Sequence, residues 1–184
     1  SAVNNLTQNS SNAKIQLLCK FVDSARTIPI DQLTPEQSRK QLNHFARLFG
    51  ASKIPLNDIY DRTIPGPNHP IPVRVYCPSE QSTKASPALL YFHGGGFVMG
   101  GLNSHDDVCA EICAATGYDV IAVDYWLAPE HRHPAMFDDA LAATQYVLAM
   151  NRLPLLLCGD SAGGNLAAAV AHALRGGVTK RIAG

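Results

Sequence analysis

Three short apolar runs, each followed by a helical pattern, dominate the second half of the chain. The runs Ala88–Phe92, Asp119–Tyr125 and Leu155–Cys158 are almost continuously apolar, which is typical of strands buried on both faces of a sheet. Helical patterns follow each run, over residues 106–116, 134–149 and 166–174. Strands that alternate with helices predict a mostly parallel sheet with helices on both faces, and therefore an α/β fold.

Terminal signals refine two of these helices. We expect Ser104 to cap the helix over residues 106–116 and Gly117 to end it. Pro134 opens the next helix, whose first turn carries Asp138 and Asp139, where a negative charge matches the helix dipole.

A hairpin is predicted before the first buried run. Ile54–Pro65 and Ile71–Cys77 are strand candidates, and the turn residues Pro65-Gly66-Pro67-Asn68 lie between them. We expect this antiparallel hairpin to extend one edge of the parallel sheet.

Two amphipathic helices are predicted in residues 1–50. Apolar residues recur at a helical period from Ala13 to Val22. A second helix begins at Thr34 and Pro35 and ends at Gly50. We treat residues 1–50 as a separate helical segment and residues 51–184 as part of the main domain.

Composition excludes several classes of partner. The 184 residues include 15 basic and 15 acidic ones, and no basic run is visible, so we expect no binding to nucleic acid or membrane. No apolar stretch approaches the length of a membrane span, and the polar residues 1–5 show no signal-peptide pattern. We expect a cytoplasmic location.

The five cysteines show no spacing typical of a metal site or a disulfide framework. Cys109 and Cys113, four residues apart on a predicted helix, could form half of a metal site, but we favour small core residues. We expect no metal and no cofactor.

The strongest chemical signal is the segment Gly159-Asp160-Ser161-Ala162-Gly163, which has the form Gly-x-Ser-x-Gly. This pattern also occurs by chance, but here a strand precedes it and a helix follows it, as a nucleophile elbow requires. The sharp turn needs glycines beside the serine, and the helix N-terminus favours developing negative charge.

A second glycine-rich segment, His93-Gly94-Gly95-Gly96-Phe97, follows a buried run. Such a loop can be a flexible turn, a phosphate cradle or an oxyanion hole. It lacks the Lys-Ser/Thr ending of a phosphate-binding P-loop. Together with the elbow it matches the loop that supplies oxyanion-hole donors in α/β-hydrolases.

The chain resembles the N-terminal part of the hormone-sensitive-lipase-like family of α/β-hydrolases, in its bacterial esterase branch. Residues 93–97, 124–131 and 159–164 carry the resemblance, which covers nearly all of residues 54–184. It implies an α/β-hydrolase fold, with residues 1–50 as a helical cap and residues 51–184 as the N-terminal portion of the catalytic domain.

The resemblance also implies roles for individual residues. Ser161 is expected to be the nucleophile, and Glu130 a structural anchor under the site. The oxyanion hole is expected to use Gly94, Gly95, Gly96 and Ala162, of which Gly94 shapes the loop and the others donate N–H groups. His93, Asp160 and Gly163 are expected to support the site.

Two departures from the family pattern are visible in residues 124–133. Trp126 stands where the family usually has Arg, and His133 where it has an apolar residue. Because Trp126 cannot form the ion pair of an Arg, we expect weaker anchoring of this loop.

The family's catalytic acid and histidine follow the serine in sequence. Here no Asp or Glu follows Ser161, and the one later histidine, His172, lies about 16 Å further along the same helix, beyond reach of the hydroxyl. Residues 181–184 resemble the start of another strand. We therefore expect a fragment of the fold, or one piece of a two-piece protein, with the acid and histidine elsewhere.

The favoured function is hydrolysis of carboxylic esters, with short acyl chains expected, through an acyl-enzyme on Ser161. The alternative is an inactive relative that binds a small ligand or a partner chain. Acyl transfer to an alcohol stays open. The expected partners are an ester substrate and either a second copy of the chain or the remaining part of the same protein.

Overall fold

The computed structural model describes residues 16, 32–49, 54–78, 87–150, 154–175 and 182–183. The chain divides into two compact units, residues 1–34 and 35–184, and almost all described residues lie in the second. The helix predicted from Ala13 to Val22 lies outside the described residues, apart from Gln16, which is helical.

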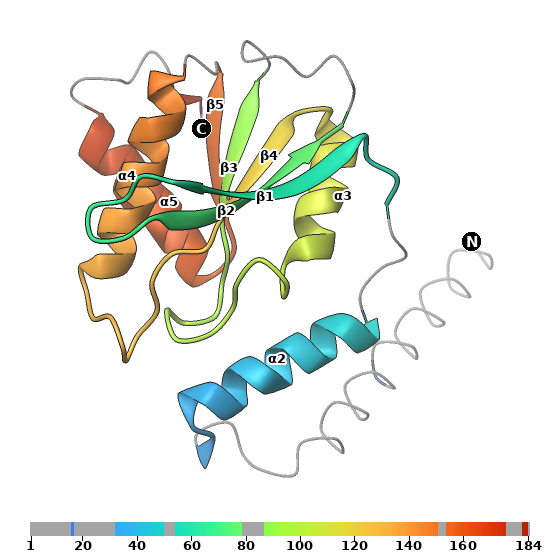
Figure 1. Ribbon diagram of the computed structural model, residues 1–184, viewed down its shortest axis with the longest axis vertical. Helices are drawn as coiled ribbons and strands as arrows, with labels where there is room; N and C mark the ends of the chain where they lie inside the picture. The colour runs from blue at the N-terminus through green and yellow to red at the C-terminus, as the bar shows by residue number, and fades with distance from the viewer. Residues whose placement is uncertain are drawn as a thin grey trace, which may run out of the picture. The chain divides into compact units, whose positions relative to one another are not determined.

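The described residues form a six-stranded sheet in the order β1-β2-β4-β3-β5-β6 (Figure 1). Its strands are β1 (Asp58–Ile64), β2 (Ile71–Cys77), β3 (Ala88–Phe92), β4 (Asp119–Val123), β5 (Leu155–Gly159) and β6 (Ile182–Ala183). Strands β3 to β6 are mutually parallel, whereas β2 is antiparallel to both β1 and β4. The predicted mostly parallel sheet with an antiparallel hairpin at its edge is confirmed.

Helices cover both faces of this sheet. The described helices are α2 (Pro35–Phe49), α3 (Asp106–Thr116), α4 (Ala135–Ala149) and α5 (Ala162–Leu174). Helix α3 packs on one face, and α4 and α5 pack together on the other (Figure 1).

Alternating side chains of each central strand feed two separate cores. On β3, Leu90 and Phe92 pack with α4 and α5, while Leu89 and Tyr91 pack with α3. Successive side chains of a strand point to opposite faces, and both faces are covered, so every residue of β3 is buried. This is the physical reason for the continuously apolar run over residues 88–92.

The predicted element boundaries hold closely, with two strands shorter than expected. Strand β1 begins at Asp58 rather than Ile54, and β4 ends at Val123 rather than Tyr125. The strand start expected at residues 181–184 is present as β6, which pairs with β5 through Leu155 and Leu156.

Two expectations about helix starts are wrong. Ser104 does not cap α3: His105 is the N-cap residue without a side-chain capping bond, and the Ser104 hydroxyl instead donates to the Gly101 carbonyl. Asp138 lies in the first turn of α4 as expected, whereas Asp139 lies beyond that turn and is fully buried, where it accepts hydrogen bonds from His69 and from the backbone N–H of Trp126.

The cysteine pair on α3 packs in the core, as favoured from the sequence. Cys109 and Cys113 are fully buried beside Tyr76, and the Cys113 thiol donates to the Tyr76 carbonyl. Burial raises the pKa of Cys113 to about 12, so its thiol stays protonated.

None of the helices in the described ranges combines the length and the apolar character that crossing a membrane requires. The cytoplasmic location stays a prediction.

Candidate active site

Ser161 lies at the sharp turn between β5 and α5. Its backbone has φ 50° and ψ −117°, which non-glycine residues rarely adopt, and the residue is exposed. The turn is closely packed: a β-carbon on Gly163 would overlap the carbonyl oxygen of Phe92, and one on Gly159 would overlap the backbone of Gly163. A strained, exposed serine between two sterically required glycines is the geometry of a nucleophile elbow.

The glycine loop folds into a tight turn after β3. Gly95, Gly96 and Phe97 all have positive φ values, of 123°, 62° and 62°. The N–H groups of Val98 and Met99 both donate to the Gly95 carbonyl, which closes the turn. A β-carbon on Gly95 would overlap the Met99 carbonyl, so only glycine fits there without a shift of the backbone.

Asp160 connects the glycine loop to the elbow. Its Oδ1 atom accepts hydrogen bonds from the Gly94 N–H and from the Tyr91 hydroxyl, each at 2.8 Å. Burial opposes ionisation, but the bond from Tyr91 and the charge of His105 outweigh it and lower the pKa of Asp160. The carboxylate is therefore ionised at neutral pH and places the loop directly beside Ser161.

His93 is buried beneath the same loop. Its ring stacks on Tyr125 at 4.3 Å, and the Tyr125 hydroxyl donates to the His93 carbonyl at 2.5 Å. Burial lowers the pKa of His93 to about 4, so the ring is neutral at pH 7. Its Nδ1 lies 2.8 Å from the Gly94 carbonyl and donates to it, since a carbonyl only accepts.

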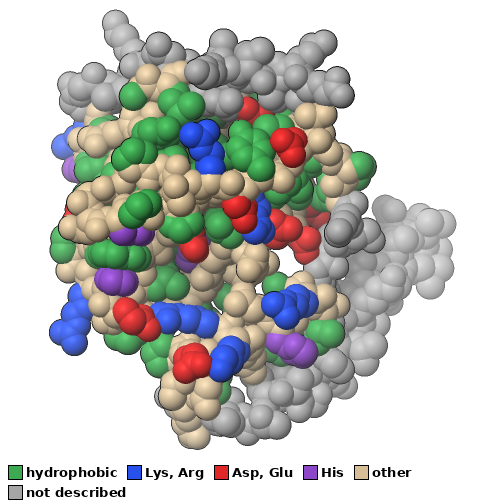
Figure 2. Space-filling view, in the orientation of Figure 1, with side chains coloured by type: hydrophobic (Ala, Val, Ile, Leu, Met, Phe, Trp, Pro, Cys, Tyr) green, Lys and Arg blue, Asp and Glu red, His purple; other side chains and the backbone are tan. Residues whose placement is uncertain are grey.

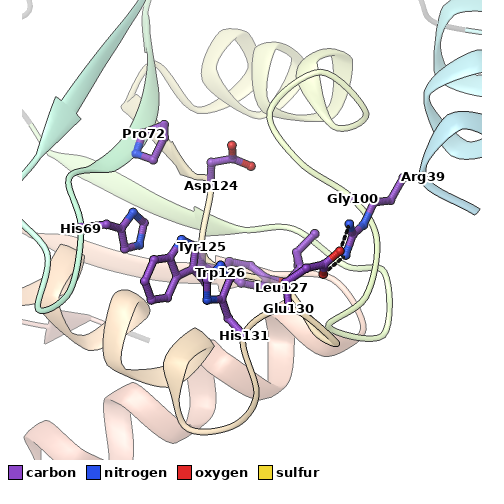
Figure 3. Close-up of a pocket in the computed structure, with 10 residues that line it drawn as sticks. All are labelled: Arg39, His69, Pro72, Gly100, Asp124, Tyr125, Trp126, Leu127, Glu130 and His131. Atoms are coloured by element: carbon purple, nitrogen blue, oxygen red, sulfur yellow. Dashed lines mark hydrogen bonds and ion pairs between the residues drawn. The ribbon is translucent and has the colours of Figure 1, made fainter. Parts of the chain in front are cut away.

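The loop after β4 is anchored by stacked rings. The Trp126 indole lies between His69 at 4.0 Å and His131 at 3.6 Å, with the ring planes within 6° of parallel (Figure 3). The backbone N–H of Trp126 donates to the buried Asp139 carboxylate, and His69 Nε2 is bonded to the same oxygen. The expectation of weak anchoring at Trp126 is wrong, because stacking and hydrogen bonds take the place of an ion pair.

Glu130 forms a contact with helix α2. Arg39 donates to both Glu130 carboxylate oxygens at 2.8 Å, and to the Val98 and Ala128 carbonyls (Figure 3). The hydrogen bond from Arg39 lowers the pKa of Glu130 to about 2. Whether Glu130 anchors the site, and whether residues 1–50 form a cap, stay predictions.

Two cavities of about 480 Å³ each border these loops. One is lined by Arg39, His69, Asp124, Trp126 and Glu130, among others. The other lies against Gly96 and Asn165 and is mainly apolar, with Phe97, Met136, Phe137 and Leu166 in its wall. Only the second borders both the glycine loop and the serine helix, so it is the better candidate for a substrate.

On the face shown in Figure 2, basic and acidic side chains are interspersed and do not gather in a patch of one sign. Among the described residues, Arg39 forms an ion pair with Glu130, and Arg74 with Asp61. Within residues 32–49, 54–78, 87–150 and 154–175, no group of three or more His, Cys, Asp or Glu side chains is arranged to hold a metal ion.

The structure places several of the site residues expected from the sequence close together, and the roles expected for them, including that of Glu130, stay predictions. Gly94, Asp160 and Gly163 meet at the point where β3 and β5 end. Sequence reasoning missed three side chains that hold this arrangement: Tyr91, Tyr125 and His105. Tyr125 lies in the segment 124–131 that carries the resemblance but was given no role, whereas Tyr91 was visible only as an aromatic residue in a buried run and His105 only as a residue before a helix.

Comparison with known proteins decides the family. A family model described as the α/β-hydrolase fold matches residues 89–184, more than half of the chain. The chain belongs to the α/β-hydrolase family. Its matched relatives confirm the hormone-sensitive-lipase-like resemblance.

Two curated relatives of this α/β-hydrolase are named for ester hydrolysis. It is 44% identical to the esterase LipI of Mycobacterium tuberculosis over 124 residues, covering 64% of this chain and 39% of the relative. It is 36% identical to the ethyl acetate hydrolase of Pseudomonas putida over 172 residues, covering 88% of this chain and 54% of the relative. The chain thus spans about half the length of the curated relatives it matches.

Solved structures of esterases are also similar to this chain. An esterase of Pyrobaculum calidifontis matches with a TM-score of 0.72 and 37% identity, over 78% of this chain and 48% of its own. A thermostable carboxylesterase from a metagenomic library matches with a TM-score of 0.76 and 36% identity, over 84% and 54%.

Proposed function

We propose that this α/β-hydrolase cleaves carboxylic esters with Ser161 as the nucleophile. The observation that carries the proposal is the hydrogen bond from the Gly94 N–H to Asp160, which holds the glycine loop beside the strained serine. The names of the relatives support the reaction class.

The proposed reaction has two halves. The Ser161 Oγ attacks the ester carbonyl carbon while a general base takes the hydroxyl proton. The N–H groups of Gly95, Gly96 and Ala162 bind the oxyanion, and Ala162 is suited to this because the first N–H groups of a helix lack partners within it. The alcohol leaves with the proton, and water then releases the acid from the acyl-enzyme.

The general base is expected outside the described residues. Within the ranges that the structure describes, no histidine is hydrogen-bonded to the Ser161 hydroxyl. The relatives are about twice as long as this chain, which leaves room for the acid and histidine in the part it does not span.

The mainly apolar cavity beside Gly96 is proposed to receive the acyl or the alcohol group. Phe97, Met136 and Leu166 in its wall favour a hydrocarbon group over a charged one. We therefore propose uncharged, short-chain esters as substrates.

The test compares Ser161→Ala with the unaltered protein in its full natural length, on p-nitrophenyl acetate and butyrate. We expect kcat to fall by about a thousand-fold or more, and labelling by a fluorophosphonate to disappear. Thr116→Ala, which removes an exposed hydroxyl at the end of α3, is the matched control and should leave both unchanged. Undiminished hydrolysis by Ser161→Ala would show that Ser161 is not the nucleophile, and an unaltered protein that binds esters without turnover would favour the inactive relative.

A further inference from the structure

His105 lies directly beside the contact between Asp160 and the glycine loop. It is the N-cap residue of α3, and its side chain is 14% exposed. Its Nε2 is 3.5 Å from Asp160 Oδ1, an ion-pair distance, and its ring centre is 5.5 Å from that of His93. No sequence motif of the site includes it.

The hydrogen bond between Ser104 and the Nδ1 atom of His105 indicates where a proton lies on the His105 ring. The Ser104 hydroxyl has one proton, which it donates to the Gly101 carbonyl, and its oxygen lies 2.9 Å from His105 Nδ1. Nδ1 must then be the donor to Ser104. Nε2 lies 3.5 Å from a carboxylate oxygen of Asp160, so a proton on this nitrogen as well would place a positive ring directly beside that carboxylate.

Among the described groups around Asp160, His105 is the one placed to supply a positive charge. The His93 ring is neutral because burial lowers its pKa to about 4, and burial raises the pKa of Tyr91, so both are uncharged at pH 7. Asp106, next in the chain, is bound to Arg74. Among the described residues, the one ion pair recorded for Asp160 is with His105.

A charge beside Asp160 matters for the proposed reaction. Asp160 must be ionised to accept from Gly94 and Tyr91, yet it stands next to the place where the oxyanion forms. Two negative charges a few ångströms apart, partly shielded from water, repel each other. Without a positive charge beside it, Asp160 would hold the loop in position, but its negative charge would also destabilise the transition state.

We propose that His105 is a positioning residue that resolves this conflict: its imidazolium offsets the charge of Asp160, so that the carboxylate can hold the glycine loop without opposing the oxyanion. The inference rests on the proposed function of Ser161, and it assigns to α3, on the far face of the sheet from α5, a role in the reaction.

A double-mutant cycle in the full-length enzyme tests this role. His105→Gln keeps a donor toward Asp160 but removes the charge, and we expect kcat on p-nitrophenyl butyrate to fall roughly ten- to a hundred-fold with KM within about twofold. Asp160→Asn keeps an acceptor for Gly94 without a charge. In that background the same His105→Gln change should cost less than about threefold.

Matched variants and outcomes separate the possibilities. His172→Gln, an exposed histidine on α5, should leave kcat unchanged, and thermal melting reports whether each variant folds. If His105→Gln does not fold, His105→Asn, which can keep the Ser104 bond, takes its place in the cycle. An equal loss of kcat in both Asp160 backgrounds, or a loss expressed in KM, would overturn the inference. Full activity of Ser161→Ala would instead overturn the proposed function.

Discussion

At the scale of single residues, the site depends on glycines at positions where the backbone leaves no room for a side chain. Gly163 lies where a side chain would meet the carbonyl oxygens of Phe92 and His93, so that β3 and the serine turn can approach only at a glycine. Gly164, the next residue, has its closest neighbour for an added β-carbon, the Gly159 carbonyl, at 3.1 Å. Gly163 and Gly164 are adjacent in α5, but an added side chain would therefore destabilise the protein far more at Gly163.

Gly163→Ala should destabilise the protein by about 3 kcal/mol, because the backbone at the end of β3 or the start of α5 must move to admit the methyl group. Gly164→Ala is the matched control: its tight contact is offset by the better helix propensity of alanine, and we expect a change within about 1 kcal/mol. Urea unfolding of both variants measures the difference. Equal stabilities would contradict the close approach at Gly163.

At the scale of elements, one side chain fastens helix α2 to the loops of the site. Arg39 reaches the Glu130 carboxylate and two backbone carbonyls, in the loop after β3 and the loop after β4. Lys40, one residue later, forms only an exposed pair with Glu36 within the same helix. Arg39 thus ties α2 to both loops at once.

Arg39→Met should release α2 while leaving the sheet folded. The two bonds to backbone carbonyls alone contribute roughly 2 kcal/mol, so amide hydrogen exchange in residues 35–49 should accelerate about thirty-fold. Lys40→Met removes a charge of the same sign and should change exchange little, since exposed pairs contribute little. Similar exchange in the two variants would show that other contacts hold the helix.

At the scale of the whole molecule, the fold buries a histidine, His93, just beyond the end of β3. The pKa of His93 is lowered to about 4, mainly by burial, against about 6.5 in an unfolded chain. Between these values the unfolded chain binds a proton that the native state does not. The free energy of unfolding therefore falls as pH drops through this window, and the contribution is fully retained above about pH 6.5.

His93→Asn, which can still donate to the Gly94 carbonyl, should remove about 3 kcal/mol of the loss in stability between pH 7 and pH 4. Denaturant unfolding at several pH values measures it, with the exposed His44→Asn as the control that keeps the unaltered slope. The same slope in both variants would mean that His93 is accessible to protons in the native state.

The sequence by itself determined the order of elements and the two glycine-containing segments of the candidate site. Strands buried on both faces, such as β3, must be apolar at every position, and glycines are required where backbones turn sharply, so both features are written in local residue patterns. That is why the parallel strands, the hairpin and the segments 93–97 and 159–163 were visible without a structure.

Only the tertiary structure decided which polar side chains meet. Asp160 and Gly94 are 66 residues apart, and Arg39 and Glu130 are 91 apart, so no local period links them. His105 shows the limit most clearly: in sequence it looks like any residue before a helix, and it lies beside Asp160 because the start of α3 meets the residue that follows β5. Which charged side chains meet depends on how distant segments pack together, and local sequence patterns do not specify that packing.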